Sequence, residues 1–229
     1  MVVELFGLPG SGKSYIATNL INELKEKNIK AVNMTEYMNN TFEGKMKKWL
    51  LLYGIQFGIL GKRTREEIIN MLPRNEDWVS KFGIYESASY SINMMVLNLL
   101  VQKMKRDDVV YIYDEGAVHS IVKMMADFEL DNSVTKKLTE YVIETISSRG
   151  GIVVYNMATI ETCLLSIKKR NRHVCTFDEL SGEKLNKILN NYKMYCDEIA
   201  NYSSVMQINR NCRMKDSIEK VMQRMLERE

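Results

Sequence analysis

The sequence predicts an α/β fold in which a five-stranded parallel sheet is covered by helices on both faces. Five short apolar runs alternate with segments of helical periodicity along the 229 residues. Runs that are apolar throughout are typical of strands in a parallel sheet. The first run also leads into a glycine-rich loop and then a helix, as a strand–loop–helix unit requires. We expect residues 1–229 to form one domain, since single cores grow to about 250 residues.

The strands are expected where apolar residues cluster between turn-forming or charged residues. They span residues 2–6, 29–34, 107–116, 151–158 and 204–209. Helices are expected where apolar residues recur every three or four positions, as Ile16, Leu20 and Leu24 do within residues 13–27. The later helices span residues 82–106, 132–150, 159–172, 181–202 and 215–229.

The loop after the first strand reads G-L-P-G-S-G-K-S and matches the pattern G-x-x-x-x-G-K-[ST]. Glycines let the backbone approach a polyphosphate closely, and the following helix offers unpaired N–H groups and the positive end of its dipole. Lys13 supplies a cation for the transferring phosphates, and the Ser14 hydroxyl is a ligand for Mg²⁺. A chance glycine-rich turn is the alternative, but this loop follows a strand and opens a helix. The expected contacts to ATP are Gly7, Pro9, Gly10, Ser11, Gly12, Lys13, Ser14 and Tyr15.

Two acidic residues, Asp114 and Glu115, end the third expected strand. In open α/β sheets, ligands bind at the carboxyl ends of the strands. We expect Asp114 to hold Mg²⁺, directly or through water, and Glu115 to orient or deprotonate an acceptor. A solvated strand end or a helix cap is the alternative interpretation of this pair.

Basic residues close the helix expected at 159–172, among them Arg170 and Arg172. They could swing over the triphosphate and neutralise charge during transfer, or they could only complement the helix dipole. The polar segment that follows suits a mobile lid. We therefore predict a lid at residues 170–181, with Arg170 and Arg172 as catalytic residues.

With these motifs the chain resembles the P-loop kinases of the nucleoside monophosphate kinase group, most of all the thymidylate-kinase-like branch. The resemblance rests on "GLPGSGKS", "ATIETCLLSIKKRNR" and "SVMQINRNCRMKDSIEKV". It implies a P-loop kinase fold, ATP and Mg²⁺ as cofactors, and an adenine bordered by Asn209 and Arg210. The chain departs from the thymidylate kinases where Asp114-Glu115 replaces an Asp-Arg pair and "NMTEYMN" replaces an Arg-Glu-Pro type segment. The segment "YDEGAVH" resembles P-loop kinase-like proteins associated with polysaccharide biosynthesis, which leaves a sugar or other non-nucleotide acceptor open.

The segment between the second and third strands is longer than a crossover needs. Residues 36–104 are expected to form a helical acceptor-binding insertion, mostly helical over 41–104 and broken at Pro73. Its candidate contacts to the acceptor are Arg63, Arg65, Arg74, Glu86 and Tyr90, each of which could equally be an ordinary surface residue.

The function expected from these motifs is transfer of the γ-phosphoryl group of ATP, with Mg²⁺, to a small-molecule acceptor. The departures from the thymidylate kinase pattern all lie in the part of the site that would bind the phosphoryl acceptor. Thymidine monophosphate is therefore expected to be a poor substrate. The alternative is a nucleotide-binding regulatory or structural protein without transfer activity, against which the intact Lys13-Ser14 pair argues.

Composition and charge argue against several other classes of protein. A net charge of +3 with dispersed basic residues does not suit a nucleic-acid partner. The most apolar stretch, residues 49–60, is shorter than the roughly 20 residues that cross a bilayer. The N-terminal residues lack the pattern of a signal peptide, and four cysteines without a C-x-x-C pair fit free thiols in a reducing cytosol. We expect a cytoplasmic protein, with a homodimer left open.

Histidines and cysteines offer no metal or nucleophile site in the sequence. His119 and His173 lack a nearby set of zinc ligands. Cys163 lies on an expected helix and is interpreted as a packed side chain rather than a nucleophile.

Overall fold

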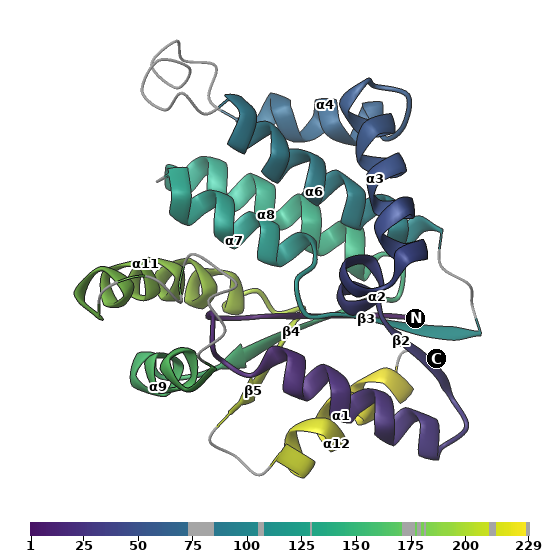
Figure 1. The fold of residues 1–229 in the computed structure, drawn as a ribbon, viewed down its shortest axis with the longest axis vertical. Coiled ribbons are helices and arrows are strands. Elements are labelled where there is room, and N and C mark those ends of the chain that lie inside the picture. The colour runs from purple at the N-terminus through teal and green to yellow at the C-terminus, as the bar shows by residue number, and fades with distance from the viewer. Residues whose placement is uncertain are drawn as a thin grey trace.

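The computed structural model describes residues 1–72, 85–104, 108–128, 130–170, 182–210 and 214–227, together with Phe177 and Leu180. It confirms the five-stranded parallel sheet, with the strand order β2-β3-β1-β4-β5 (Figure 1). The strands are β1 (Val2–Phe6), β2 (Lys30–Asn33), β3 (Val109–Tyr113), β4 (Ile152–Met157) and β5 (Val205–Asn209). β1 is central, because Val3 aligns with Ile112 of β3 on one side and with Ile152 of β4 on the other. The glycine-rich loop therefore leaves the middle of the sheet.

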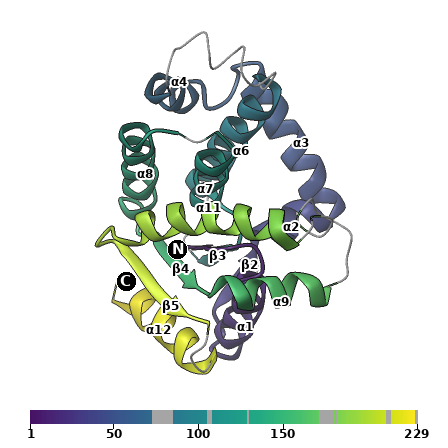
Figure 2. The ribbon, with the colours of Figure 1, turned by 90° about the vertical axis from the view of Figure 1, so that its left-hand side faces the viewer.

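Helices cover both faces of the sheet, as Figures 1 and 2 show. One face carries α1 (Lys13–Glu26) and α12 (Met214–Leu226), and the other carries α7 (Ala117–Phe128), α8 (Asn132–Ser147) and α11 (Gly182–Ala200), with α9 (Ile160–Arg170) packed beside α11. Val3 and Leu5 of β1 belong to the buried cluster under α1 and α12. Val2 and Phe6 belong to the larger cluster on the other face. Burial on both faces is why the strands are apolar throughout.

The described part of the region between β2 and β3 is mostly helical, as expected. It contains α2 (Met34–Asn40), α3 (Phe42–Gln56), α4 (Lys62–Met71) and α6 (Tyr85–Lys103). The side chain of Asn33 accepts a hydrogen bond from Glu36 N and begins α2, and the side chain of Thr41 does the same for Gly44 N in α3. α4 ends at Met71, and Leu72 is extended, as the residue before a proline should be.

Two features differ from the expected elements. The sequence analysis did not predict α7, although His119, Lys123 and Asp127 recur every four positions as its polar face; eight of its 12 residues are buried. β3 is shorter than expected at its end, since the backbone N–H groups of Asp114 and Glu115 donate to Thr35 Oγ1 at 3.2 and 3.3 Å. These two acids therefore leave the sheet and turn toward α2.

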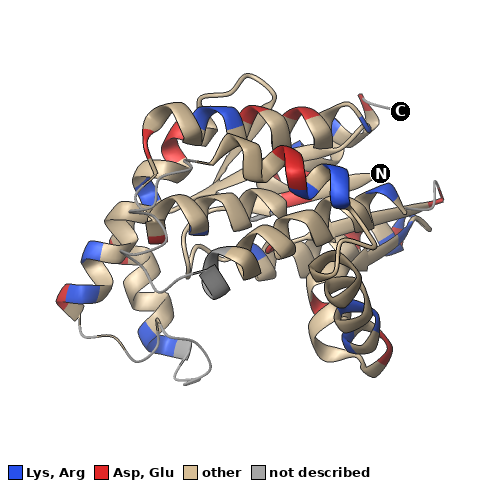
Figure 3. Ribbon diagram, turned by 90° about the horizontal axis from the view of Figure 1, so that it is seen from above, with Lys and Arg blue, Asp and Glu red and all other residues tan. Residues whose placement is uncertain are grey.

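Charge is mixed over the described surface. Acidic and basic residues are interspersed along the helices in Figure 3, which agrees with the dispersed charges of the sequence. Within the described residues, the helices are too short or too polar for any of them to cross a bilayer.

Candidate active site

The glycine-rich loop bends back at the end of β1 through three residues with positive φ. Gly7, Gly10 and Gly12 have φ values of 145°, 81° and 95°, which side chains other than hydrogen rarely permit. The first two also lack space for a side chain. A Cβ on Gly7 would lie 2.7 Å from Asn156 O, and a Cβ on Gly10 would lie 2.7 Å from Cys163 O. The loop is thus packed tightly against β4 and α9, and Cys163 is fully buried, as expected of a packed thiol.

The N-terminus of α1 is open toward the loop. Gly12 is the N-cap, no side chain among the described residues caps the helix, and its first turn holds no acid. The unpaired N–H groups of that turn and the helix dipole are therefore free to bind an anion. Ser14 and Tyr15 are exposed at this end of the helix. These features fit a polyphosphate and the role expected of the loop.

Lys13, the cation expected to contact the phosphates, is largely buried. Only 8% of Lys13 is exposed, and its Nζ donates to Gly7 O at 2.9 Å and to Leu8 O at 3.0 Å. Burial lowers the pKa of Lys13, and the negative charge of Glu115 acts in the opposite direction. The ammonium group is thus held against the loop carbonyls, close enough to Glu115 to interact with it electrostatically.

Two side chains from distant parts of the chain support the loop. Asn156 on β4 is fully buried and its Nδ2 donates to Ser11 O at 2.8 Å. The guanidinium of Arg210 donates to Gly10 O and, at 2.8 Å, to Ser166 Oγ. The guanidinium of Arg210 therefore lies on the loop itself, and the contact with an adenine that the resemblance implies stays a prediction. Asn209, the neighbouring residue, ends β5 and aligns with Met157 of β4.

Asp114 and Glu115 lie beside the loop, at the end of the strand that neighbours β1. Asp114 is buried, and its Oδ1 has no hydrogen-bond partner among the described residues. A buried carboxylate oxygen without a partner is costly, and a bound cation would satisfy it. Glu115 is exposed and lines the adjoining cavity. In the described part of the chain, no group of three or more His, Cys, Asp or Glu side chains could hold a metal.

A buried carboxylate joins β1 to the segment that carries these two acids. Glu4 is completely buried and accepts hydrogen bonds from Gln102 Nε2 at 3.1 Å and from Val118 N in the first turn of α7. Burial raises the pKa of Glu4 to about 7, although these hydrogen bonds lower it. A Cβ on Gly116 would overlap the Glu4 carboxylate. Glu4 therefore anchors the start of α7, and with it the position of Asp114 and Glu115.

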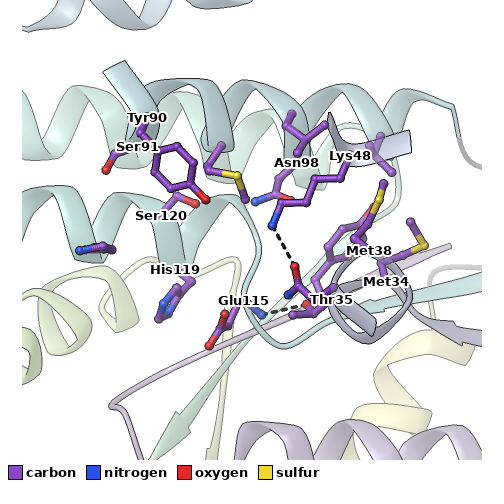
Figure 4. A pocket seen from close by; sticks show the side chains of 16 residues that line it. Met34, Thr35, Met38, Lys48, Tyr90, Ser91, Asn98, Glu115, His119 and Ser120 are labelled. Atoms are coloured by element: carbon purple, nitrogen blue, oxygen red, sulfur yellow. Dashed lines mark hydrogen bonds between the residues drawn. The ribbon is translucent and has the colours of Figure 1, made fainter. Parts of the chain in front are cut away.

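A cavity of about 190 Å³ opens next to Glu115, between α2, α3, α6 and α7 (Figure 4). Its apolar lining consists of Met34, Met38, Met94, Leu97 and Val101. Its polar lining consists of Thr35, Asn39, Lys48, Tyr90, Ser91, Asn98, Tyr113, Glu115, His119, Ser120 and Lys123. Figure 4 shows Glu115 and His119 along one edge, across from Tyr90, Ser91 and Asn98. An apolar cavity with a few converging polar groups is typical of a small-molecule site.

Three buried polar atoms of this lining have no partner among the described residues. They are Asn98 Nδ2, the Tyr113 hydroxyl and His119 Nδ1. Burial lowers the pKa of His119 to about 3, and the charge of Lys13 acts in the same direction, so the imidazole is neutral at physiological pH. Buried polar groups are normally paired, and a ligand with hydrogen-bonding groups would pair these three.

Of the expected acceptor contacts whose side chains the structure describes, one lies at the cavity. Tyr90 lines it, whereas Arg63 pairs with Glu67 at 2.9 Å and Arg65 Nε donates to Asn93 Oδ1 at 3.1 Å. Arg74 and the Glu86 side chain lie outside the described residues, as do the Arg170 side chain, Arg172 and most of the expected lid. The cavity lining itself was mostly missed, because it combines residues from five elements without a local motif.

The chain has the fold of P-loop kinases. No protein-family model and no curated protein matches the sequence. A solved structure of deoxyadenosine kinase from M. mycoides, with dCMP and dCDP bound, is 17% identical, covers 100% of both chains and has a TM-score of 0.52. The same protein with dATP is similar at 17% identity and TM-score 0.52 over 99% of this chain and 100% of that one. Shikimate kinase from Acinetobacter baumannii is 15% identical over 99% and 93%, with a TM-score of 0.46. These structures do not single out the thymidylate kinase branch.

Proposed function

We propose that this chain transfers the γ-phosphoryl group of ATP, with Mg²⁺, to a hydroxyl group of a small molecule bound in the cavity beside Glu115. One observation carries the proposal. The open N-terminus of α1 and the Asp114-Glu115 pair lie at the carboxyl ends of neighbouring strands, and Glu115 both interacts electrostatically with Lys13 and lines the cavity. A phosphate donor and an acceptor bound at these two places would meet at Glu115.

The residues of the loop fit the donor. The backbone N–H groups from Gly7 to Ser14 and the first turn of α1 would hold the phosphates, with Lys13 as the cation. Ser14 and the unpartnered Oδ1 of Asp114 would hold the metal ion. When bound, MgATP supplies the transferable phosphoryl group. Arg170 and Arg172 are proposed to close over this site from the end of α9.

The carboxylate of Glu115 is the group best placed to act on the acceptor. It would accept the hydrogen bond of the reacting hydroxyl and orient its oxygen, and it would take the proton as transfer proceeds. The neutral imidazole of His119 and the Asn98 amide would hold other polar groups of the acceptor. The methionine side chains of the cavity lining would pack against the apolar part of the acceptor.

The lining favours an uncharged acceptor over a nucleoside monophosphate. Its cations are Lys48 and Lys123, and each has a partner already: Lys48 Nζ donates to Asn39 Oδ1 at 2.8 Å, and Lys123 pairs with Asp127. A phosphate-binding subsite usually contains arginine in a forked geometry, and no arginine lines the cavity among the described residues. A nucleoside is the first acceptor class to test, because the similar deoxyadenosine kinase structures hold nucleotide products. Sugars are the second class, favoured by the "YDEGAVH" resemblance.

The test is a coupled assay of ATP-to-ADP conversion with four deoxynucleosides, the common nucleoside monophosphates and a panel of sugars. We expect acceptor-dependent turnover with at least one uncharged hydroxyl compound. Lys13→Met and Glu115→Gln are the controls, and both should abolish it. Tight ATP binding without an acceptor in any class would instead favour a nucleotide-binding protein without transfer activity.

A further inference from the structure

Helix α3 is apolar on two opposite faces. Its inner face is buried through Gly44, Gly54 and Ile55. Its outer face presents six large apolar side chains that are between 49% and 83% exposed. We call them the α3 stripe: Phe42, Met46, Trp49, Leu50, Tyr53 and Phe57. Figure 2 shows α3 along the edge of the molecule, and none of the described residues covers this outer face.

The aromatic residues of the stripe contact one another. The ring centroids of Trp49 and Tyr53 are 5.0 Å apart, and those of Tyr53 and Phe57 are 4.8 Å apart. These contacts hold the rings in a continuous surface before any partner binds, which lowers the entropic cost of association. Contiguous exposed apolar patches of this kind mark interaction sites rather than ordinary surface.

The order of residues in the stripe is symmetric about its midpoint. At about 100° per residue, the six positions fall within a single arc of roughly 100° on the helix. Counted from the point between Trp49 and Leu50, Met46 and Tyr53 are equally distant, and so are Phe42 and Phe57. A second α3 that runs antiparallel would therefore place an apolar residue against each member of the stripe.

We propose that the α3 stripe is the interface of a homodimer in which the two α3 helices pack antiparallel. A two-fold interface must be complementary to itself: where one residue meets a second, the second also meets the first, and residues beside the axis meet their own copies. The stripe meets this condition: Phe42 lies against Phe57 of the partner subunit, and Met46 lies against Tyr53 of the partner subunit. Trp49 and Leu50 lie beside the two-fold axis, close to Trp49 and Leu50 of the partner subunit.

The exposed area is sufficient for a stable dimer. Aromatic side chains bury roughly 150–250 Å² each when fully covered. Phe42, Trp49, Tyr53 and Phe57 are 83%, 60%, 53% and 63% exposed, so together they offer on the order of 500 Å². Met46 and Leu50 are 49% and 55% exposed and bring the area to roughly 700 Å² per subunit, close to the ~800 Å² that one partner usually contributes to a specific interface.

A membrane surface is the competing occupant, and the charges of α3 disfavour it. Binding to anionic lipid requires a cluster of cations around the apolar face. Near the stripe, α3 exposes Lys45 and Lys47 but also Glu43, and Lys48 is turned inward, donating to Asn39. The dimer does not depend on the proposed transfer reaction, although α3 also carries Lys48 into the cavity wall.

The first experiment measures mass in solution by light scattering after gel filtration, from 1 to 100 µM protein. We expect twice the chain mass of 26.6 kDa for the wild type. Trp49→Glu should be monomeric over the same range, with the dimer dissociation constant raised at least 100-fold, because it places two like charges beside the two-fold axis. Leu226→Glu is the matched control, since Leu226 is 66% exposed on α12, and it should remain dimeric.

A second experiment is independent of any destabilisation by charge. Leu50→Cys should form a disulfide-linked dimer on mild oxidation, and Lys47→Cys, on another side of α3, should not. A monomeric wild type at 100 µM would overturn the proposal, and so would a dimer that Trp49→Glu leaves intact. A monomer that binds anionic vesicles through Trp49 would also overturn it and assign the stripe to a membrane surface.

Discussion

The buried carboxyl of Glu4 should make the stability of the folded protein depend on pH. The carboxyl titrates at 4.5 when free of the fold and at about 7 within it, chiefly because burial disfavours its charge. Between these two values the folded protein holds a proton that the unfolded chain has released. Stability therefore falls as the pH rises through this window, and the loss is complete above pH 7. Below pH 4.5 both states are protonated and Glu4 contributes no pH dependence.

The size of this loss follows from the two pKa values. A difference between 4.5 and about 7 corresponds to roughly 3 kcal/mol at 1.36 kcal/mol for each pKa unit. In a domain of this length, about 3 kcal/mol shifts the melting temperature by about 6–12 °C. The substitution Glu4→Gln removes the ionisation and keeps an oxygen to accept from Val118 N.

The measurement is urea unfolding followed by circular dichroism at pH 5, 6, 7 and 8, without nucleotide. Relative to the wild type, Glu4→Gln should gain about 2.5 kcal/mol of unfolding free energy between pH 5 and pH 8. Glu26→Gln, at an exposed position at the end of α1, should follow the wild-type profile. A difference between Glu4→Gln and wild type that stays constant within about 1 kcal/mol, or that changes in the opposite direction, would refute the reasoning.

Four further predictions concern the proposed phosphotransferase site. Lys13→Met should lower turnover by at least ~100-fold with an unchanged circular dichroism spectrum, because it keeps the side-chain volume and removes only the charge. Asp114→Asn should weaken Mg²⁺-dependent activity far more than the melting temperature, and an unchanged magnesium titration would assign Asp114 to a structural role. Arg170→Ala and Arg172→Ala should lower kcat more than ATP affinity, since a lid arginine acts on charge that develops during transfer; loss of affinity alone would contradict the lid. Gly10→Ala, at φ 81° and with its Cβ 2.7 Å from Cys163 O, should cost about 1–3 kcal/mol of unfolding free energy, and a loss below 0.5 kcal/mol would contradict the strain.

The sheet and the phosphate loop could be predicted because their signals are local. An apolar run followed by "GLPGSGKS" specifies a strand, a turn and a helix within 13 residues, and each glycine has a positive φ or a crowded position that explains it. The strands are apolar because both of their faces are buried. Such apolar runs can be recognised in the sequence without knowing which strands pair.

The supports of the site could not be predicted because they join residues far apart in the sequence. Glu4 accepts a hydrogen bond from Val118 N at the start of α7, which lies 114 residues later in the sequence. Asn156 donates a hydrogen bond to Ser11 O, which lies 145 residues earlier. The only sequence signal for either is a single polar residue within an apolar strand, as in "VVELF" and "IVVYNM". Arg63 and Arg65 were chosen as acceptor contacts by charge alone, yet both are engaged by neighbours in α4 and α6.

The central place of β1 has a consequence for how the protein is made. β1 is synthesised before the other strands of the sheet, but its two neighbours are Val109–Tyr113 and Ile152–Met157. The glycine-rich loop also cannot complete its contacts until Arg210 has been synthesised, because the Arg210 guanidinium donates a hydrogen bond to Gly10 O. Non-local pairing of this kind is slow and comes late in folding. The nucleotide site should therefore assemble late during synthesis, and the first binding of a triphosphate by a nascent chain would report that the chain has emerged at least as far as Arg210.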